Sequence, residues 1–338
     1  MKVSCVLIAF LVQLAHYLGG LSYSTESCPT HSWSSLPPTV SRTTKTKKLV
    51  IAHRGASGYL PDHSLPAVAL AVHMGADYIE QDLVVTKDDH LIVFHDVRID
   101  ASTDVASIFP NRSRADGRYY AVDFTLAEVR QLGITGRPNI SDHTGLSTRF
   151  PAEKGRFQIP TLADEVDLIK GLAKTLNRAE VGVYPELKEP VFHRSEGKDI
   201  AKLAVAELKR LGLKDEVFPE IDVDYRLTYA LRDAQAFDET TGPGWLKMVA
   251  TVDGIVPWMA LVTHLSNGSS TGLAETARRK GLLVHPYVLR REDVGDLAAF
   301  ANTFDELHHA LLVEADVDGV ITDFPDDTKE FLRRTTDW

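Results

Sequence analysis

Three acidic residues lie on or beside apolar, strand-like runs of this chain. Glu80 and Asp82 are two residues apart within residues 78–85, and Glu186 follows residues 181–185. Alternate residues of a strand point to the same side, so Glu80 and Asp82 are expected to share one face. Carboxylates on an apolar interior face need a cation or a proton to offset their charge. Oxygen donors without cysteine favour a hard divalent cation, Mg²⁺ or Ca²⁺.

Two histidines and two basic residues accompany these acids. His53 follows the apolar residues 49–52, and His95 ends a second apolar run. Histidine is the side chain whose ordinary pKa suits acid and base catalysis near neutral pH. Arg54 is a planar donor suited to a phosphate group, and Lys188 stands two residues after the third acid. These are side chains that bind a phosphate and move protons around it.

Each of these positions also has a structural interpretation. Acids on a strand are common on the solvated face of a sheet. A histidine at the end of a strand is often a hydrogen-bonded packing residue. Arg54 and Lys188 would then serve only as ion-pair partners of neighbouring carboxylates. The grouping of two histidines with three acids favours the functional interpretation, but the residue types alone leave the structural one open.

The elements that position these residues alternate between strand and helix. Residues 49–52 predict a short buried strand, and residues 78–85 predict a second one. Between them, Ser64 and Pro66 mark the start of a helix and Gly75 marks its end. A strand–helix–strand unit of this kind implies parallel pairing of the two strands.

A hairpin is expected directly after the second strand. Only twelve residues separate Asp82 from His95, which is too few for a parallel crossover, and residues 87–89 form a turn. Symmetric pairing about that turn predicts Thr86 opposite Leu91 and Asp82 opposite His95. A slip of one residue would turn the His95 side chain away from the acids.

The same alternation continues along the chain. Helices are expected at residues 162–176, 199–211 and 304–314, and strands at residues 181–187, 282–289 and 319–323. This order predicts an α/β fold, a (β/α)8 barrel of the TIM type. Residues 101–158 lack periodicity and are expected to form a long insertion over the barrel mouth. The 36 residues at 215–250 are short for two strand–helix units, so the barrel is expected to be irregular there.

Five ordered blocks of sequence carry a more specific signal. They are HRGASGYLPDHS at 53–64, YIEQDLVVTKDD at 78–89 with FHD at 94–96, YPELK at 184–188, VHPY at 284–287 and TDFP at 322–325. In this order they resemble the glycerophosphodiester phosphodiesterases of glycerol and lipid metabolism, and most closely the periplasmic-type branch. The resemblance covers most of residues 48–327. Relatives of that branch would have two strand–helix units where residues 215–250 have room for one.

The resemblance implies a role for each site residue. His53 and His95 would act as acid and base, and Arg54 and Lys188 would bind the phosphate. The ligands of the divalent cation, Ca²⁺ or Mg²⁺, would be Glu80, Asp82 and Glu186. The reaction implied is hydrolysis of a glycerophosphodiester to glycerol 3-phosphate and an alcohol, at the C-terminal ends of the barrel strands. Two alternatives remain: a phospholipase D-like phosphodiesterase or lyase acting on lysophospholipids, and an inactive barrel that only binds phosphodiesters.

The N-terminus has the pattern of a signal peptide over residues 1–24. Met1 and Lys2 precede an apolar run at residues 3–18, and small residues follow. The run is shorter than the ~20 residues that cross a bilayer, so we expect cleavage and no stable membrane insertion afterwards. Residues 25–44, rich in Ser, Thr and Pro, are expected to be a flexible segment that leads into the barrel domain at residues 45–338. The mature protein would be secreted, or periplasmic in a bacterium.

Cysteine and asparagine positions fit this interpretation. Cys5 lies in the predicted signal peptide, so Cys28 has no partner for an internal disulfide. Glycosylation signals begin at Asn111, Asn139 and Asn267, which makes a glycoprotein the expectation in a eukaryotic source.

Composition limits the remaining choices. The chain has 338 residues with 44% hydrophobic and 25% charged residues, which is typical of a globular protein and excludes wholesale disorder. Its 37 basic and 47 acidic residues give a net charge of −10. Because nucleic-acid binding needs a basic surface, we expect a small-molecule phosphodiester and not a nucleic acid as the partner.

Overall fold

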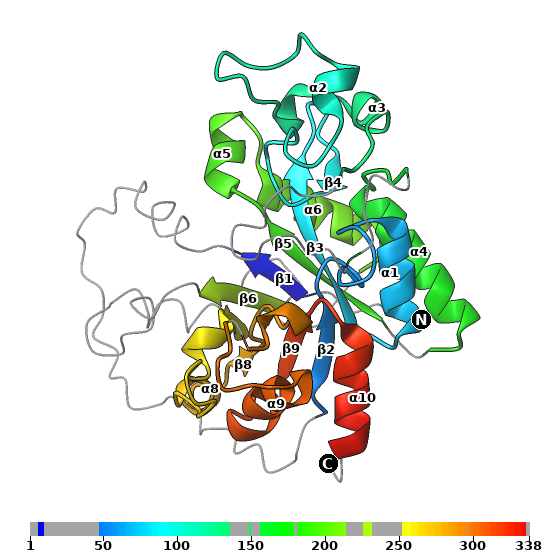
Figure 1. The fold of residues 1–338 in the computed structure, drawn as a ribbon. Helices are drawn as coiled ribbons and strands as arrows, with labels where there is room; N and C mark the ends of the chain where they lie inside the picture. The colour runs from blue at the N-terminus through cyan, green and yellow to red at the C-terminus, as the bar shows by residue number, and fades with distance from the viewer. Residues whose placement is uncertain are drawn as a thin grey trace, which may run out of the picture.

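The structure is a computed structural model, and it describes residues 6–9, 47–135, 149, 156–178, 181–213, 226–231, 252–295 and 297–335. Within these residues a sheet of nine strands forms the centre, and helices surround it (Figure 1). The predicted flexible segment at 25–44, Cys28 and the glycosylation signal at Asn139 lie outside the described residues.

The sheet is built mainly from parallel strands. Their order is β8 (Leu283–Val284), β7 (Gly254–Pro257), β6 (Arg226–Leu231), β1 (Val6–Ala9), β5 (Gly182–Leu187), β3 (Tyr78–Val85), β2 (Leu49–Ala52) and β9 (Gly319–Thr322). The amide of Asp318 donates to the carbonyl of Val284 at 3.1 Å, and the amide of Ile321 donates to that of Pro286 at 2.9 Å. These bonds join the two ends of the strand order, as the predicted TIM-type barrel requires.

Apolar side chains fill the space inside this ring of strands. The interior cluster consists of Ile51 from β2, Tyr184 from β5, Val256 from β7 and Ile321 from β9. A barrel interior packed in this way is a core and not a pore. Since side chains alternate along a strand, the residues two positions further on face inward again, at the C-terminal end of the barrel. His53, Glu186 and Asp323 occupy three of those positions.

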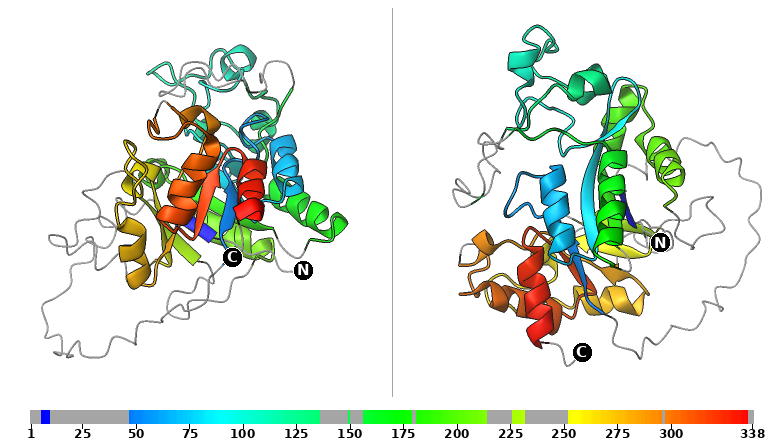
Figure 2. Two further views of the ribbon diagram at one scale, coloured as in Figure 1. Left: turned by 60° about the horizontal axis from the view of Figure 1, so that its bottom comes forward. Right: turned by 90° about the vertical axis from the view of Figure 1, so that its right-hand side faces the viewer.

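Helices cover the outer faces of the sheet. They are α1 (Leu65–His73), α4 (Leu162–Thr175), α5 (Pro190–Ser195), α6 (Ile200–Arg210), α8 (Leu273–Arg279), α9 (Phe304–His309), which continues as η8 (Ala310–Glu314), and α10 (Pro325–Thr335). One apolar cluster packs α1, α4 and α6 against β3 and β5, and a second packs the last helices against β7 to β9. Figure 2 shows α1 and α4 side by side along β3.

Capping residues fix where these helices begin, and Ser64 is the one predicted from the sequence. The hydroxyl of Ser64 accepts a hydrogen bond from the amide of Ala67 at the start of α1. Thr161 and Asp164 form a reciprocal capping box at the start of α4. Each such cap contributes on the order of 1 kcal/mol to the helix that it begins.

The hairpin after β3 is present, but its predicted register is wrong by one residue. Strand β4 (Leu91–Val93) pairs with β3 so that Leu91 lies opposite Val85. The cause is the loop: the amide of Thr86 donates to the carbonyl of His90 at 2.9 Å, and Asp89 between them has a φ of 64°. Three residues therefore form the loop, and Thr86 pairs with His90 instead of Leu91.

The register shift does not carry His95 away from the acids. The amide of Phe94 donates to the carbonyl of Asp82 at 2.8 Å, so Phe94 takes the place opposite Asp82 that was predicted for His95. Strand β4 ends at Val93, and the strict alternation of side chains ends with it. His95 stays near enough to Asp82 for that charge to act on its pKa.

Strand β1 lies inside the segment predicted to be a signal peptide. It pairs in parallel with β5 and with β6, and Ile8 is opposite Glu186. This is the place where residues 215–250 were expected to fall short, and the described part of that stretch contributes one strand, β6. Without a strand between β5 and β6, backbone groups of both strands would be unpaired. Strand β1 occupies this place and pairs with both.

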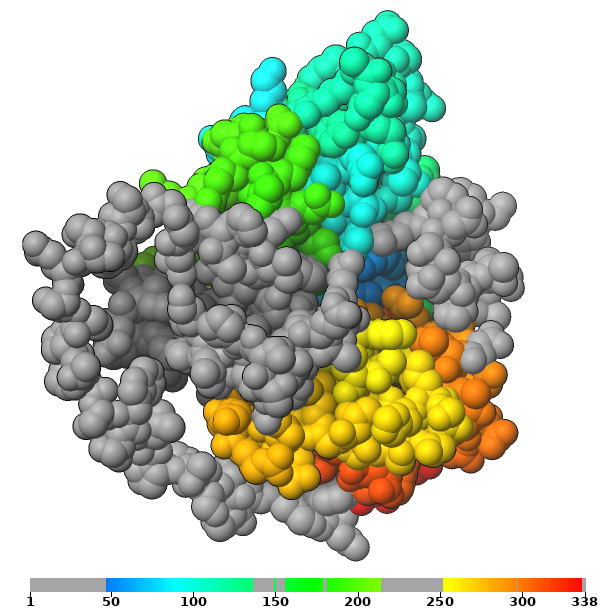
Figure 3. All heavy atoms as spheres, turned by 90° about the vertical axis from the view of Figure 1, so that its left-hand side faces the viewer, coloured from blue at the N-terminus to red at the C-terminus, as the bar shows by residue number. Residues whose placement is uncertain are grey.

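The predicted insertion forms a separate mass beside the C-terminal end of β3. Its described part carries α2 (Val105–Ile108), η3 (Ala121–Asp123) and α3 (Leu126–Val129), packed on an apolar cluster with β4. Arg114 binds Asp123 and Glu196 at 2.7 Å each, which ties the insertion to the segment after α5. Figure 3 shows the insertion projecting from the molecule with residues of α5 and α6 against its base. Within the described ranges, no helix has both the length and the apolar character needed to cross a bilayer.

Candidate active site

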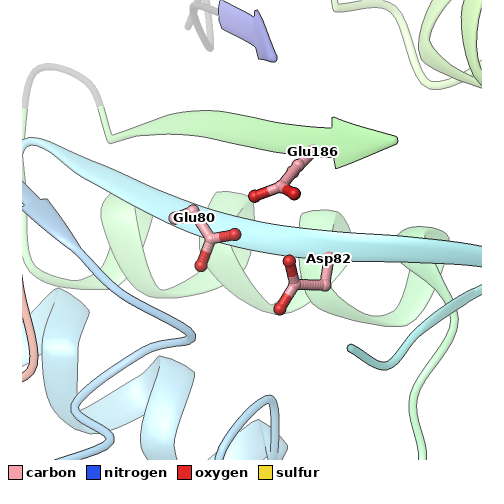
Figure 4. A group of neighbouring side chains, drawn as sticks. All are labelled: Glu80, Asp82 and Glu186. Carbon is pink, nitrogen blue, oxygen red and sulfur yellow. The ribbon is translucent and has the colours of Figure 1, made fainter. Parts of the chain in front are cut away.

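Three carboxylates converge where β3 and β5 run side by side. Each of Glu80, Asp82 and Glu186 offers an oxygen, and these oxygens all lie within 4.8 Å of one another (Figure 4). The pairing of the strands explains this, because Asp82 is directly opposite Glu186. Glu80 and Asp82 are only 2% and 1% exposed, so the solvated-face interpretation does not hold for them.

Arg54 and Lys188 are the cations in contact with these acids. The Arg54 amide donates to Glu80 at 2.9 Å, and its guanidinium Nε lies 2.9 Å from an oxygen of Asp82. The ammonium of Lys188 lies 2.7 Å from Glu186 and 3.3 Å from Asp82. Two fixed positive charges thus face three acidic groups in a buried place.

The pKa values reflect this imbalance. Burial raises the pKa of Glu80 well above its ordinary value, and the charge of Asp82 adds to the rise. Burial also acts to raise the pKa of Asp82, but Lys188 and Arg54 outweigh it and hold that pKa well below its ordinary value. Burial raises the pKa of Glu186 as well, with Lys188 opposing it. The site therefore holds three carboxyl groups but only two positively charged side chains to neutralise them.

This donor set fits a divalent cation. Three carboxylates whose oxygens lie within 4.8 Å of one another, with no sulfur and no imidazole among them, match the type of ligand that Mg²⁺ or Ca²⁺ takes. A doubly charged ion would also offset the excess acid that now raises the pKa of Glu80 and Glu186.

The two predicted histidines each pair with a carboxylate through Nδ1. Nδ1 of His53 lies 2.6 Å from Asp323, and Nδ1 of His95 lies 2.7 Å from Asp96. Burial, with Arg54 second, lowers the pKa of His53 to about 4 and that of His95 to about 3. Both rings are therefore neutral at neutral pH, with one nitrogen that can accept a proton.

A tightly wound loop carries His53 and Arg54. Arg54 and Gly55 have φ angles of 57° and 83°, and a Cβ on Gly55 would lie 2.7 Å from the backbone of Ala67. The Ser57 hydroxyl donates to the carbonyl of His53 at 2.7 Å. This closeness requires glycine at position 55 and holds the loop against the start of α1.

The structure also places residues here to which the sequence alone assigned no role. Nε2 of His63, which is 2% exposed, lies 2.8 Å from Asp82, and Asp62 binds the Arg54 guanidinium at 2.9 Å. Asp323 binds His53. The sequence could have indicated a site role for Asp323, because this acid directly follows a buried strand. His63 and Asp62 lie in a loop, where no periodicity predicts the direction of a side chain.

All seven predicted site residues lie at the same end of the sheet. They are His53, Arg54, Glu80, Asp82, His95, Glu186 and Lys188. Residues 53–327 match the model of the glycerophosphoryl diester phosphodiesterase family. The chain belongs to that family. The expected α/β barrel and the family resemblance read from the sequence are thereby confirmed.

Curated members of this family align with most of the chain. A glycerophosphodiester phosphodiesterase of Haemophilus influenzae is 36% identical over 334 residues, covering 86% of this chain and 91% of that protein. One of Treponema pallidum is 32% identical over 334 residues, covering 85% of this chain and 92% of that protein.

Solved structures agree on the fold. A putative glycerophosphoryl diester phosphodiesterase from Silicibacter pomeroyi superposes with a TM-score of 0.59 at 19% identity, covering 85% of this chain and 93% of that one. An Oleispira antarctica phosphodiesterase, solved in complex with the product sn-glycerol-3-phosphate, gives 0.54 at 19% identity, covering 84% and 96%.

Proposed function

We propose that this chain hydrolyses glycerophosphodiesters to glycerol 3-phosphate and an alcohol. The observation that carries the proposal is the meeting of three acids, two carboxylate-paired histidines and two cations at the C-terminal end of the strands. That is the end at which barrels of this type place their chemistry. The curated relatives that align over most of this chain are named for the same activity.

Each residue has a task in this reaction. Arg54 and Lys188 would hold the phosphate oxygens and offset the charge that develops on them. A divalent cation held by Glu80, Asp82 and Glu186, Mg²⁺ or Ca²⁺, would supply a Lewis acid for a phosphate oxygen. One histidine would take a proton from the attacking water at its free ring nitrogen. The other would have to carry a proton on both ring nitrogens once the substrate is bound, and would give one of them to the alcohol as its bond to phosphorus breaks. Such acid–base groups typically contribute 10²–10⁴-fold to the rate.

The deciding experiment measures product from defined substrates. Glycerol 3-phosphate is assayed after incubation with glycerophosphocholine and other glycerophosphodiesters, with and without a chelator. We expect release of glycerol 3-phosphate that the chelator abolishes and that added Mg²⁺ or Ca²⁺ restores. Cleavage of lysophosphatidylcholine alone would indicate the phospholipase D-like function, and binding without turnover would indicate an inactive barrel.

Two variants separate the metal ligands from the acid–base pair. Glu80→Gln removes one of the three carboxylates, so cation binding and activity should fall together. His95→Ala leaves the carboxylates intact, so cation binding should persist while turnover falls by about 10²-fold or more. Full activity of Glu80→Gln would reject the ligand assignment, and full activity of His95→Ala would reject the proton-transfer role.

We also propose that the protein is exported. The apolar run at residues 3–18 supports this, as do the exposed positions of Asn111 and Asn267 in their glycosylation signals. Cleavage near residue 24 would remove strand β1 and open the sheet between β5 and β6. N-terminal sequencing of protein recovered from the medium or periplasm tests both the export and the cleavage near residue 24. A start beyond residue 24 supports a signal peptide, whereas an intact N-terminus supports a retained strand.

A further inference from the structure

The geometry points to Asp323 as the positioning residue of His53, and to Arg149 as a second positioning residue, which holds Asp323. The inference deepens the proposed function, since it concerns how one of the two proton-transfer groups is held. It rests on a cluster at the ends of β2 and β9 that links three distant parts of the chain.

The barrel places Asp323 level with His53. Ile51 of β2 is paired with Ile321 of β9, and both side chains belong to the interior cluster. His53 and Asp323 come two residues later, directly after the ends of β2 and β9. The amide of His53 donates to the carbonyl of Thr322 at 2.9 Å. The two side chains therefore face the same way on neighbouring strands, and their 2.6 Å contact follows from the register.

Charge decides which ring nitrogen of His53 carries the proton. Asp323 is 1% exposed, and its second oxygen binds Arg149 at 2.7 Å and Arg290 at 3.0 Å. Two guanidinium groups keep this carboxylate ionised, so it can only accept hydrogen bonds. Nδ1 of His53 must then donate, which leaves the lone pair on Nε2. Asp323 in this way selects the nitrogen that exchanges a proton with the substrate.

Arg149 binds that carboxylate from a distant position in the chain. It belongs to the insertion at residues 101–158, and its guanidinium also binds Glu292 at 2.9 Å and 3.2 Å. It donates to the carbonyl of Ser57 at 3.3 Å, and its guanidinium carbon lies 5.6 Å from the centre of the Phe324 ring. The Arg149 side chain is only 11% exposed. One arginine thus links the loop after β2, the end of β9 and the segment after β8.

The charges of this cluster balance without His53. Arg149 and Arg290 carry two positive charges, and Asp323 and Glu292 carry two negative ones. His53 can therefore stay neutral beside its buried partner. An imidazole that exchanges a proton with the substrate must be able to exist in this neutral form. Loss of Arg149 would leave an acid in excess beside His53, so the orientation of His53 depends on a residue far from it in sequence.

The first test reads the His53 ring directly and does not depend on activity. Nitrogen-15 spectra of histidine-labelled protein are recorded at pH 7, with His53 assigned through His53→Gln. We expect His53 to carry its proton on Nδ1, and Asp323→Asn to convert it largely to the other tautomer or to a mixture. A proton on Nε2 in the unmodified protein overturns the inference, whether or not any variant folds.

The second test separates positioning from structure by kinetics. Asp323→Asn should lower kcat by about 10²-fold or more with KM changed less than about threefold, because orientation acts on the chemical step. Arg149→Met should lower kcat by about 10-fold. Its matched control is Arg118→Met, which removes another insertion arginine paired with a carboxylate, Asp100 at 2.7 Å, and should leave kcat unchanged.

The outcomes distinguish this inference from the proposed function. If glycerophosphodiesters are not cleaved, the proposed function fails while the tautomer of His53 still tests Asp323. If cleavage occurs and Asp323→Asn keeps its kcat, the positioning role is overturned. Equal effects of Arg149→Met and Arg118→Met overturn the role of Arg149 as the link.

Discussion

Replacing Lys188 by methionine should move cation binding and catalysis in opposite directions. Lys188 is 6% exposed, and its ammonium contacts two of the three carboxylates, at 2.7 Å and 3.3 Å. It therefore competes with a divalent cation for the same oxygens, while it also supplies charge for the phosphate. Methionine keeps much of the side-chain length and removes the charge.

The expected magnitudes follow from these contacts. Removing one partner of a buried ion pair typically costs ~3–5 kcal/mol, so the cation-free protein should lose about that much stability. A unit charge about 4 Å away acts with ~4 kcal/mol at an effective dielectric constant of ~20. Only ~1.4 kcal/mol of this is needed to tighten cation binding by about tenfold. Turnover should fall by about 10²–10³-fold, as it does when one electrostatic donor to a transition state is lost.

Calorimetric titration with Mg²⁺ or Ca²⁺, urea denaturation with and without chelator, and steady-state kinetics measure the three quantities. The matched control is Lys329→Met, because Lys329 also pairs with a largely buried carboxylate, Asp77 at 2.5 Å, away from the site. The control should lose stability and keep both cation affinity and turnover. Wild-type turnover in Lys188→Met would refute the phosphate role, and weaker cation binding would refute the competition argument.

Three further substitutions test the packing around the site. Gly58→Ala should cost about 1–3 kcal/mol in urea denaturation, because its Cβ would lie 2.3–2.6 Å from atoms of the buried Phe324 ring. Adding Phe324→Leu to the same chain should relieve that cost. An unchanged urea midpoint of Gly58→Ala would contradict the clash. His193→Phe should cost about 1–3 kcal/mol, since Nε2 of this buried histidine accepts from the amide of Val85 at 3.1 Å; unchanged stability would show that the bond is dispensable. Burial raises the pKa of Glu165 well above its ordinary value, so the folded chain keeps a proton that the unfolded chain releases. Its contribution to stability should therefore fall by up to ~1.4 kcal/mol per pH unit from the unfolded pKa of ~4.3 up to the folded pKa. Glu80 and Glu186 add a fall of the same sign, so Glu165→Gln should make the decline shallower in thermal melts across pH. An unchanged slope in Glu165→Gln would contradict this contribution.

Local patterns in the sequence were enough to predict most elements and the acids of the site. The alternation in residues 78–85 placed Glu80 and Asp82 on one face, and β3 has these bounds. The capping residue Ser64 predicted the start of α1, and the helix expected from residue 162 begins there as α4. These features depend on neighbours a few residues apart, so the sequence contains all the information that they need.

Other features depend on which distant segments meet, and the sequence could not supply them. The register after β3 was wrong by one residue because a three-residue loop and the predicted four-residue loop look alike in a short polar turn. The sheet position beside β5 is taken by Val6–Ala9, although these residues have the composition of a signal peptide. Hydrophobicity alone does not show whether an apolar run forms a buried strand or enters a membrane, because both environments remove it from water.

The sequence by itself determined the chemistry that is present in this protein: the acids, the histidines, the cations and the strands that carry them. Only the tertiary structure decided that Asp323 holds His53, from 270 residues away in the chain, and that Arg149 reaches the same carboxylate from the insertion. The physical reason is that a side chain's type and its direction on a strand are local properties, whereas its partner depends on which strands become neighbours when the barrel forms.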